Sequence, residues 1–542
     1  MRQTISAELQ KRLFCLKIDS CTKGHPFFAI NAQFVADRSL QLRTLSVRQM
    51  FVSQTAANLK AEICEVLEEE YNVPVENVYS ITSDNGTNMI NATELLGESQ
   101  EAIFAADNSW DAADDAETWE AGCVLQSKDY KCQCVRCAAH TLQLAVEAAM
   151  KETEGCLSLS ETCRKIVRKL RTTTMRRLLN NQKQPIPCLD VSTRWHTTYN
   201  MLVSVLKLKP FIQDNFGTGD GDEECDGGEA TASNKNCPLL TESDWADIDS
   251  LVEALTPSKL ATQRLQQEQL LLGDFLAIWM KCKNALKKLS GTLPAAVIKH
   301  MERLEKSTSY KTGSRKGQEH LPPLFEYPVI LAAIFMDPRY FTYLDEEQVQ
   351  VAKDHLEKLW TRMEAMRKKW ESTEEEVETP SDTDKEVDMG SDSEDSGGKD
   401  EFDSFLKQKN AARITSLQER AAIRTILDTY YANTEMVSAK TNILHWWHDK
   451  RVTHPELYAL SSVALAVPAT QVSVERLFSS LTFIFDPLRR NMDTSFLNDL
   501  LVLRNNKIFK RKEGTEKSKS SGISEDIANI ASTSHSQSSF SE

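Results

Sequence analysis

Two aspartates near the N-terminus follow apolar, β-branched segments, and both could hold a divalent cation. Residues 78–81 are typical of a buried strand, and Asp84 follows in "SITSDNGTNM", where Asn-Gly indicates a turn before a helix. Asp19 similarly ends the apolar segment "LFCLKID". If these two strands are neighbours, the carboxylates lie side by side, a natural seat for Mg²⁺ or Mn²⁺, which take oxygen ligands. The alternative for Asp84 is a helix cap, since Asp is a favoured N-cap residue.

A third carboxylate usually completes a site of this kind. In two-metal phosphoryl transfer the ions lie about 4 Å apart and contact both the attacking and the leaving oxygen. Glu475 in "QVSVERLFSSL" is a candidate, because apolar residues flank it at helical spacing. A Glu-Arg pair on an amphipathic helix is usually a solvated face, so the residue types alone do not assign Glu475 to a site.

The charge of the chain is concentrated in three acidic stretches. The 542 residues carry a net charge of −15, yet residues 371–404 hold 15 acids and 2 lysines, and residues 105–120 and 216–234 hold six acids each and no base. The remainder has a net charge of +10, which is compatible with contact to phosphates. Residues 371–404 and the Ser-rich residues 514–542 have the composition of disordered segments.

The chain shows no sign of a membrane or secretory destination. No run approaches the ~18 apolar residues of a membrane span, and the N-terminus has no apolar signal-peptide core. The 13 cysteines have no framework spacing, so we expect free thiols in the nucleus or cytosol. Cys132, Cys134, Cys137 and His140 could bind zinc, but four ligands on one short stretch suit a tetrahedron poorly, and zinc is not expected.

The pattern of elements predicts a small sheet followed by many helices. Strands are expected at residues 13–19, 27–35 and 40–47, then a helix at 55–71, then the strand that leads to Asp84. The first three strands should form an antiparallel meander, and the fourth should pair parallel to one of them after the crossover helix. Amphipathic helices are expected at 134–151, 159–179 and 193–212, with helical periodicity across 241–370.

Five motifs in order along the chain resemble the hAT superfamily of DNA transposases. They are "SDNGTNM" (83–89), "RCAAHTLQLAV" (136–146), "STRWHTTYNML" (192–202), "FMDPRY" (335–340) and "ILHWWHDKRVTHPELYALSSVALAVPATQVSVERLFSS" (443–480). Each motif is moderately specific, and their occurrence in this order is strongly specific.

The resemblance implies an α/β RNase H-like catalytic core interrupted by a large all-α insertion domain, with a helical C-terminal dimerisation region. The expected parts are the first part of the core at 10–205 with an acidic insert at about 97–128, the insertion at 206–370, a disordered acidic linker at 371–404, the dimerisation region with the last core helix at 410–508, and a disordered tail at 514–542.

The resemblance also implies roles for individual residues. Catalytic and metal-binding acids of a cut-and-paste mechanism would be Asp19, Asp84 and Glu475, with Mg²⁺ or Mn²⁺, and DNA contacts would come from Arg194, Trp195 and His140, with Cys137 supporting the His140 motif. Trp195 would stack on an unpaired base. Each has a structural alternative, since Trp195 could be a core tryptophan and His140 a satisfied buried histidine. Trp446 and Trp447 are expected to pack within a dimer core.

Two departures from the family pattern bear on function. Ser20, Cys21 and Thr22 stand where the family commonly has Gly-Trp-Thr, and the first expected strand begins at Leu13, which leaves no room for an N-terminal BED-type zinc finger. Three functions therefore stay open: an active transposase, a catalytically silent transposase-derived protein that binds DNA or chromatin as a dimer, and an interaction scaffold. We favour a nuclear, transposase-derived protein with a chemically plausible site, with DNA and itself as partners and no membrane.

Overall fold

The computed structural model describes residues 1–107, 131–191, 194–216, 238–306, 323–378, 421–484 and 493–506. The expected disorder of the tail at 514–542, and of most of the acidic linker, falls outside these ranges. So does most of the acidic insert. The helix that precedes the linker continues to Glu378, seven residues beyond the expected start of the linker.

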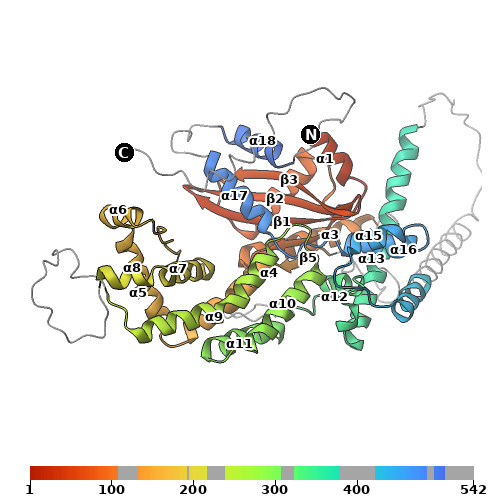
Figure 1. Cartoon of the computed structure of the whole chain (residues 1–542). Coiled ribbons are helices and arrows are strands. Elements are labelled where there is room, and N and C mark those ends of the chain that lie inside the picture. Colours follow the sequence, from red (N-terminus) through yellow and green to blue (C-terminus); the bar gives the residue numbers. More distant parts are fainter. Residues whose placement is uncertain are drawn as a thin grey trace, which may run out of the picture. The chain divides into compact units, whose positions relative to one another are not determined.

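Helices make up most of the described chain, and the strands lie near its N-terminus (Figure 1). The elements are α1 (Arg2–Leu9), β1 (Phe14–Lys23), β2 (His25–Ala36), β3 (Ser39–Gln49), α2 (Ala56–Cys64), the π-helical η1 (Glu65–Glu70), the 3-10 helix η2 (Val75–Asn77), β4 (Val78–Ser83), α3 (Thr87–Asp107), β5 (Gln133–Arg136), α4 (Ala138–Glu152), α5 (Cys156–Leu170), α6 (Thr173–Asn181), α7 (Trp195–Lys207), α8 (Lys209–Phe216), α9 (Glu242–Leu265), α10 (Leu272–Leu286), α11 (Thr292–Lys306), α12 (Pro328–Phe335), the 3-10 helix η4 (Phe341–Tyr343), α13 (Glu346–Glu378), α15 (Ile443–Asp449), α16 (Pro455–Ala464), α17 (Val472–Ile484) and α18 (Thr494–Asn505). Residues 421–433 are also helical.

The strands form one five-stranded sheet in the order β3-β2-β1-β4-β5. β1, β2 and β3 form the predicted antiparallel meander, and β4 pairs parallel to β1 after the crossover, as expected. β5 pairs parallel to β4 and was missed, because it lies inside the expected helix at 134–151. A strand of four residues is too short to show a period of its own beside a strongly amphipathic helix.

Helices α17 and α18 cover one face of the meander, although more than 400 residues separate them from it in sequence (Figure 1). Their apolar side chains form a buried cluster with the sheet, which comprises Phe27, Ala29, Val47, Val474, Leu477, Phe478, Leu481, Leu497 and Leu501. The residues that predict an amphipathic helix around Glu475 therefore bury their apolar side against β1 and β2.

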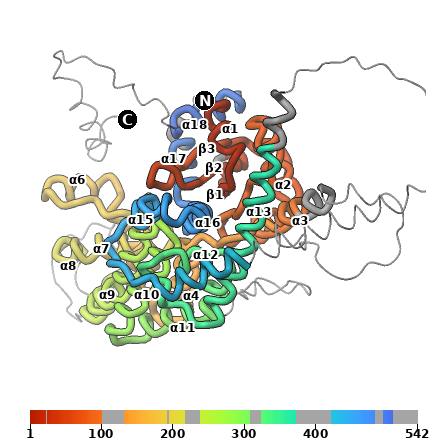
Figure 2. Tube along the Cα trace, turned by 90° about the vertical axis from the view of Figure 1, so that its right-hand side faces the viewer, coloured from red at the N-terminus to blue at the C-terminus, as the bar shows by residue number. Residues whose placement is uncertain are grey.

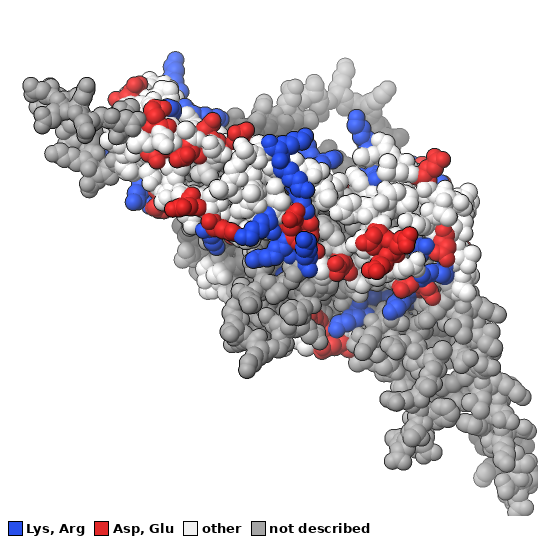
Figure 3. All heavy atoms as spheres, turned by 90° about the horizontal axis from the view of Figure 1, so that it is seen from below, with Lys and Arg blue, Asp and Glu red and all other residues white. Residues whose placement is uncertain are grey.

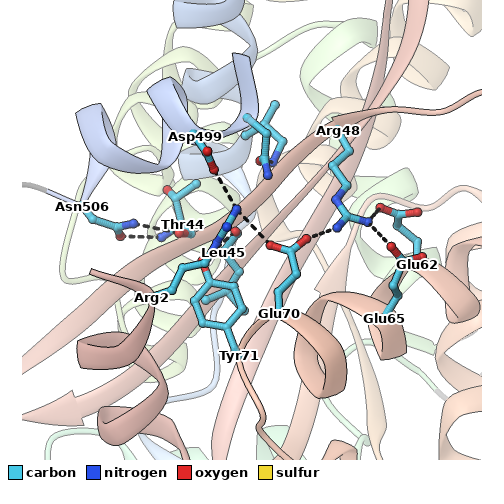
Figure 4. Close-up of polar contacts among 12 residues, drawn as sticks. Arg2, Thr44, Leu45, Arg48, Glu62, Glu65, Glu70, Tyr71, Asp499 and Asn506 are labelled. Carbon is cyan, nitrogen blue, oxygen red and sulfur yellow. Dashed lines mark hydrogen bonds and ion pairs between the residues drawn. The ribbon is translucent and has the colours of Figure 1, made fainter. Parts of the chain in front are cut away.

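The outer edge of β3 is covered by side-chain amides of α18 (Figure 4). Asn506 accepts a hydrogen bond from the Thr44 backbone N–H and donates one to the Thr44 carbonyl, both at 2.8 Å, and Asn498 accepts from the Val47 N–H at 2.8 Å. At the same edge Arg2 joins Asp499 of α18 at 2.7 Å. An uncovered edge strand can pair with another chain, so these contacts both hold α18 in place and protect the edge.

Helices α4–α13, α15 and α16 contribute side chains to two hydrophobic clusters. Figure 2 shows these helices from a second side. The smaller one joins α5, α6, α7 and α8 to the beginning of α9, and it straddles the boundary at residues 205 and 206 expected between core and insertion. The larger one joins α4 to α9–α13, α15 and α16. The chain is therefore a mixed α/β protein of mostly helical content with a helical C-terminal region. Among the helices in the described ranges, none is long and apolar enough to cross a membrane.

The long helix α13 is fixed to the sheet by polar contacts at β4. The Tyr79 hydroxyl lies 2.6 Å from Nε2 of His355, and Arg362 donates to the carbonyl of Val78 at 3.0 Å. Burial, followed by the charges of Lys358 and Arg362, lowers the pKa of His355 to about 4. His355 is therefore neutral at physiological pH.

The low pKa of His355 predicts an acid-sensitive attachment of α13. Since the folded-state pKa lies below the unfolded value of 6.5, its contribution to stability is complete above about pH 6.5 and is lost as the pH falls through about 4. His355→Gln, which can still hydrogen-bond Tyr79, should reduce this acid-side loss of unfolding free energy by about 2 kcal/mol. Urea denaturation at both ends of this pH window measures the effect. The exposed His25→Gln is the control, and equal pH dependence in the two variants would contradict the prediction.

Candidate functional site

The pairing of β1 with β4 brings Asp19 and Asp84 to neighbouring positions. Lys17 lies opposite Thr82 in this parallel pair, and Asp19 and Asp84 each follow two residues later. The expectation that the two strands are neighbours is confirmed. One detail was wrong, because β1 continues to Lys23, so that Asp19 lies within the strand and only Asp84 follows a strand end. β1 extends further since it pairs with β2 along its whole length.

Asp84 also closes the turn that leads into α3. Its Oδ1 accepts a hydrogen bond from the Gly86 N–H at 2.9 Å. A Cβ at Gly86 would lie only 2.9 Å from that same oxygen, which explains why this position suits glycine. This contact belongs to the turn before α3, which begins at Thr87, and is not the helix cap considered as the alternative. It uses Oδ1 of Asp84.

Glu475 reaches the same region because residues 466–473 are tied to the strands. Thr82 of β4 donates to the Pro468 carbonyl at 2.7 Å, and the Ala138 N–H at the start of α4 donates to the Ala469 carbonyl at 2.9 Å. Glu475 comes directly after this segment, in the first turn of α17. Asp19 is on the face of the sheet that α17 covers, since its partner Ala29 packs in the α17 cluster.

His140, in the first turn of α4, faces Glu475 across this site. Its Nδ1 lies 3.9 Å from Oε1 of Glu475 and 3.4 Å from Nε2 of Gln471. Both side chains are about one-third exposed, at 31% for His140 and 37% for Glu475. The Gln471 Oε1 is buried and has no hydrogen-bond partner among the residues that the structure describes. Turning this amide by 180° would place Oε1 against a protonated Nδ1 and give both groups a partner.

The charges of the other two acids affect the pKa of Asp19. The side chain of Asp19 is buried, and burial together with the negative charges of Asp84 and Glu475 raises its pKa to about 7. Nearby His140 acts in the opposite direction on this pKa, since an imidazolium favours the carboxylate. Asp19 is therefore a carboxylate that a neighbouring cation would stabilise.

Cationic groups also border the acids. Burial works to lower the pKa of His140, but its hydrogen bond with Cys137 and the charges of Cys137, Glu475 and Asp19 outweigh burial and raise the pKa to about 9. Lys17 lies two residues before Asp19 on the same face of β1, and burial lowers its pKa to about 8. The site therefore combines the buried Asp19 and two partly exposed acids with two groups that can carry positive charge near neutral pH.

No ready-made ion site is present in the part of the chain that the structure describes, because no three His, Cys, Asp or Glu side chains there are grouped closely enough to hold a metal as they stand. The donor types and their charges nevertheless suit a hard divalent cation. Cys137 is fully buried at the N-terminus of α4, and burial raises the pKa of the neighbouring Cys134 thiol to about 11. A high thiol pKa opposes the thiolate that zinc requires.

Arg194 and Trp195 of the Arg-Trp motif make no direct polar contact with the three acids in the described part of the chain. Trp195 begins α7 with only 2% of its surface exposed, and it belongs to the larger hydrophobic cluster, which also contains residues of α4. A base could not stack on a ring buried in this way, so the placement favours the core alternative. Arg194, immediately before it, is exposed. Within the described ranges, no hydrogen bond or ion pair connects either residue with Asp19, Asp84 or Glu475.

Two residues of the site were missed by sequence reasoning. Lys17 could have been found, because alternation along β1 places it on the face of Asp19. Gln471 gave no such signal, since its role depends on how residues 466–473 run between distant elements.

Two family models match the C-terminal region and part of the helical region of the chain. The model of the hAT family C-terminal dimerisation region matches residues 427–507, and the model of the ZBED1 RNase-like helical domain matches residues 135–254. Zinc finger BED domain-containing protein 4 of Homo sapiens is 22% identical over 355 residues, which cover 64% of this chain and 27% of the human protein. The Arabidopsis thaliana zinc finger BED domain-containing protein DAYSLEEPER is 21% identical over 345 residues, which cover 60% of this chain and 40% of the plant protein. The two matching models and the two relatives support a hAT-type, transposase-derived protein.

The chain spans only 27% and 40% of the length of these two relatives. Its dimerisation region supports self-association. Trp447 was expected in a dimer core, but it is buried within its own chain and donates to the Met336 carbonyl at 2.8 Å. Trp446 is only partly buried and lines a groove of about 580 Å³ within the dimerisation region.

Proposed function

We propose that this hAT-type protein has an RNase H-like core with a DDE-type site for phosphoryl transfer on DNA in the nucleus. One observation carries the proposal: Asp19 and Asp84 occupy equivalent positions on neighbouring parallel strands, and Glu475 from α17 is close enough to act on the pKa of Asp19. In this proposal residues 10–205 and the last core helix form the core, residues 206–370 form the insertion, and residues 410–508 contain the dimerisation region together with that last core helix.

The three acids would hold Mg²⁺ or Mn²⁺. When bound, such an ion supplies Lewis-acid activation and charge neutralisation at the reacting phosphate. Asp19 contributes a carboxylate that is buried beside two other negative charges. Without a bound cation, its ionised form is therefore disfavoured. Glu475 and the second oxygen of Asp84 complete the set from α17 and from the end of β4.

His140 and Lys17 would act on the DNA. A protonated His140, next to Glu475, can donate a hydrogen bond to a phosphate oxygen. Lys17 adds a buried positive charge on the same face of β1 as Asp19. Both would offset negative charge that develops on the phosphate in the transition state.

A nicking assay tests the proposal. The intact chain is incubated with a labelled branched DNA duplex and Mn²⁺, alongside Asp19→Asn and Asp84→Asn. We expect metal-dependent cleavage that falls by at least about a hundredfold in each variant, as is typical when a group essential for electrostatic stabilisation is removed. Equal cleavage by the wild type and both variants would reject the acids as the active site.

A catalytically silent, dimeric DNA-binding or scaffold protein is the second candidate. It is favoured by the absence, within the described residues, of three ligand side chains already grouped for a metal. Salt-dependent DNA binding without any metal-dependent cleavage would identify the DNA-binding form of this second function. No DNA binding at all would leave the scaffold.

A further inference from the structure

The helical hairpin of α5 and α6 carries an unusual concentration of positive charge. Residues 164–183 contain eight Lys and Arg residues and no Asp or Glu. This stretch belongs to none of the hAT motifs and plays no part in the acid site. On the face shown in Figure 3, by contrast, acidic and basic side chains lie close together over much of the surface.

The hairpin is held by its apolar side, so the basic residues keep fixed positions. Ile166, Val167 and Leu170 of α5 and Met175 and Leu179 of α6 are buried in the smaller hydrophobic cluster. Both orthogonal views show α6 at the outside of the helical cluster (Figures 1 and 2). The bases therefore form an ordered outer surface.

Some of the eight bases have structural partners. Arg164 binds both oxygens of Asp190, at 2.7 and 2.6 Å, and Arg171 donates to the Pro187 carbonyl at 2.8 Å. Arg168 lies 3.5 Å from Glu161 but is 57% exposed. These contacts stabilise the hairpin itself.

Of the other five bases, Lys169 is only partly exposed. Four bases are exposed and make no ion pair with any residue in the described ranges, namely Lys165, Arg176, Arg177 and Lys183. Lys165 and Arg168 are spaced i,i+3 on α5, an arrangement that places like charges next to each other and destabilises a helix. An external polyanion would relieve the repulsion between these like charges.

We propose that the exposed bases of the α5–α6 hairpin bind the sugar-phosphate backbone of DNA. The inference rests on the proposed function, since DNA is the substrate that the acid site would use. Arginine pairs with phosphate through two parallel N–H donors, and each neutralised phosphate releases condensed counterions. The hairpin would thus hold the duplex by charge, independent of sequence, while the acids act on one phosphate.

The test measures the salt dependence of binding to a fluorescent DNA duplex of arbitrary sequence, with EDTA present to prevent cleavage. For Arg176→Gln/Arg177→Gln in the full chain we expect affinity near 0.1 M salt to fall by roughly tenfold or more, since each lost phosphate contact removes about 0.9 from the slope of log K against log salt. Arg176→Lys/Arg177→Lys retains the charge and should retain most of the affinity.

Lys287→Gln/Lys288→Gln is the matched control, because these two lysines are also adjacent and exposed, at the end of α10. It removes the same charge and should leave the slope nearly unchanged. Identical slopes for the wild type and the α6 variant would overturn the inference, as would an equal loss in both glutamine variants. If the wild type binds no duplex, the DNA-directed proposed function fails as well, whereas DNA binding that ignores Arg176 and Arg177 leaves that function standing.

Discussion

Without divalent cations, Asp19→Asn is expected to raise the free energy of unfolding at about pH 8 by roughly 2 kcal/mol. Burial and the charges of Asp84 and Glu475 raise the pKa of Asp19 from 3.8 to about 7. Because the folded-state value lies above the unfolded one, the favourable contribution of Asp19 is complete below about pH 3.8 and is lost as the pH rises through about 7. Above that pH a buried carboxylate lies beside like charges, and asparagine removes this cost.

Urea denaturation in EDTA at about pH 5 and pH 8 measures the effect. The advantage of Asp19→Asn should be smaller at pH 5, where the folded wild type is mostly protonated at Asp19. Asp449→Asn, at an exposed position at the end of α15, is the matched control and should show no such pH-dependent gain. A variant that is no more stable than the wild type at pH 8 would mean that the acids do not repel one another in the folded protein.

Asp337→Ala is expected to lower the free energy of unfolding by about 3–5 kcal/mol. Asp337 is fully buried, and its two oxygens accept from Nε and Nη2 of Arg339 at 2.9 and 2.7 Å. Arg339 also pairs with Asp274 at 2.8 Å. Alanine would leave the buried guanidinium with only one of its two carboxylate partners and would leave a gap against Gly273, where a Cβ would lie 2.2 Å from Asp337 Oδ2.

The shift of the urea midpoint at constant m-value measures this loss. Glu364→Ala is the control, since its partner Arg367 is 59% exposed and an exposed pair contributes less than about 1 kcal/mol. A loss of under about 1 kcal/mol for Asp337→Ala would show that the Asp-Pro-Arg motif is not a structural centre of the helical part.

Local sequence patterns were sufficient to predict four of the five strands and the proximity of Asp19 to Asp84. The β-branched segments and turn residues of 13–47 predicted the meander, and the crossover helix predicted the parallel pairing that brings Asp84 beside Asp19. The N-terminal helix α1 and the short strand β5 were not anticipated. The expected helix at 159–179 is in fact α5 and α6, which separate at Arg171 and Thr172.

Local sequence patterns could not predict which residues far apart in the chain come close together in the fold. Glu475 is near Asp19 only because residues 466–473 hydrogen-bond to β4 and α4, and the resemblance to hAT transposases, rather than periodicity, suggested that proximity. For Trp195 the motif left base stacking and a core position both open, and burial within the larger hydrophobic cluster favours the core position. Burial depends on which distant helices meet, and this information is spread over the whole chain.

The central claim is that Asp19, Asp84 and Glu475 bind a divalent cation for phosphoryl transfer. Calorimetric titration of Mn²⁺ into the intact chain and into Asp84→Asn, each with and without branched DNA, tests it most directly. We expect the wild type to bind Mn²⁺, more strongly with DNA present, and we expect this binding to be lost in Asp84→Asn. Binding of equal strength by the wild type and the variant, or no binding by the wild type even with DNA, would contradict it and leave Asp84 as a turn residue.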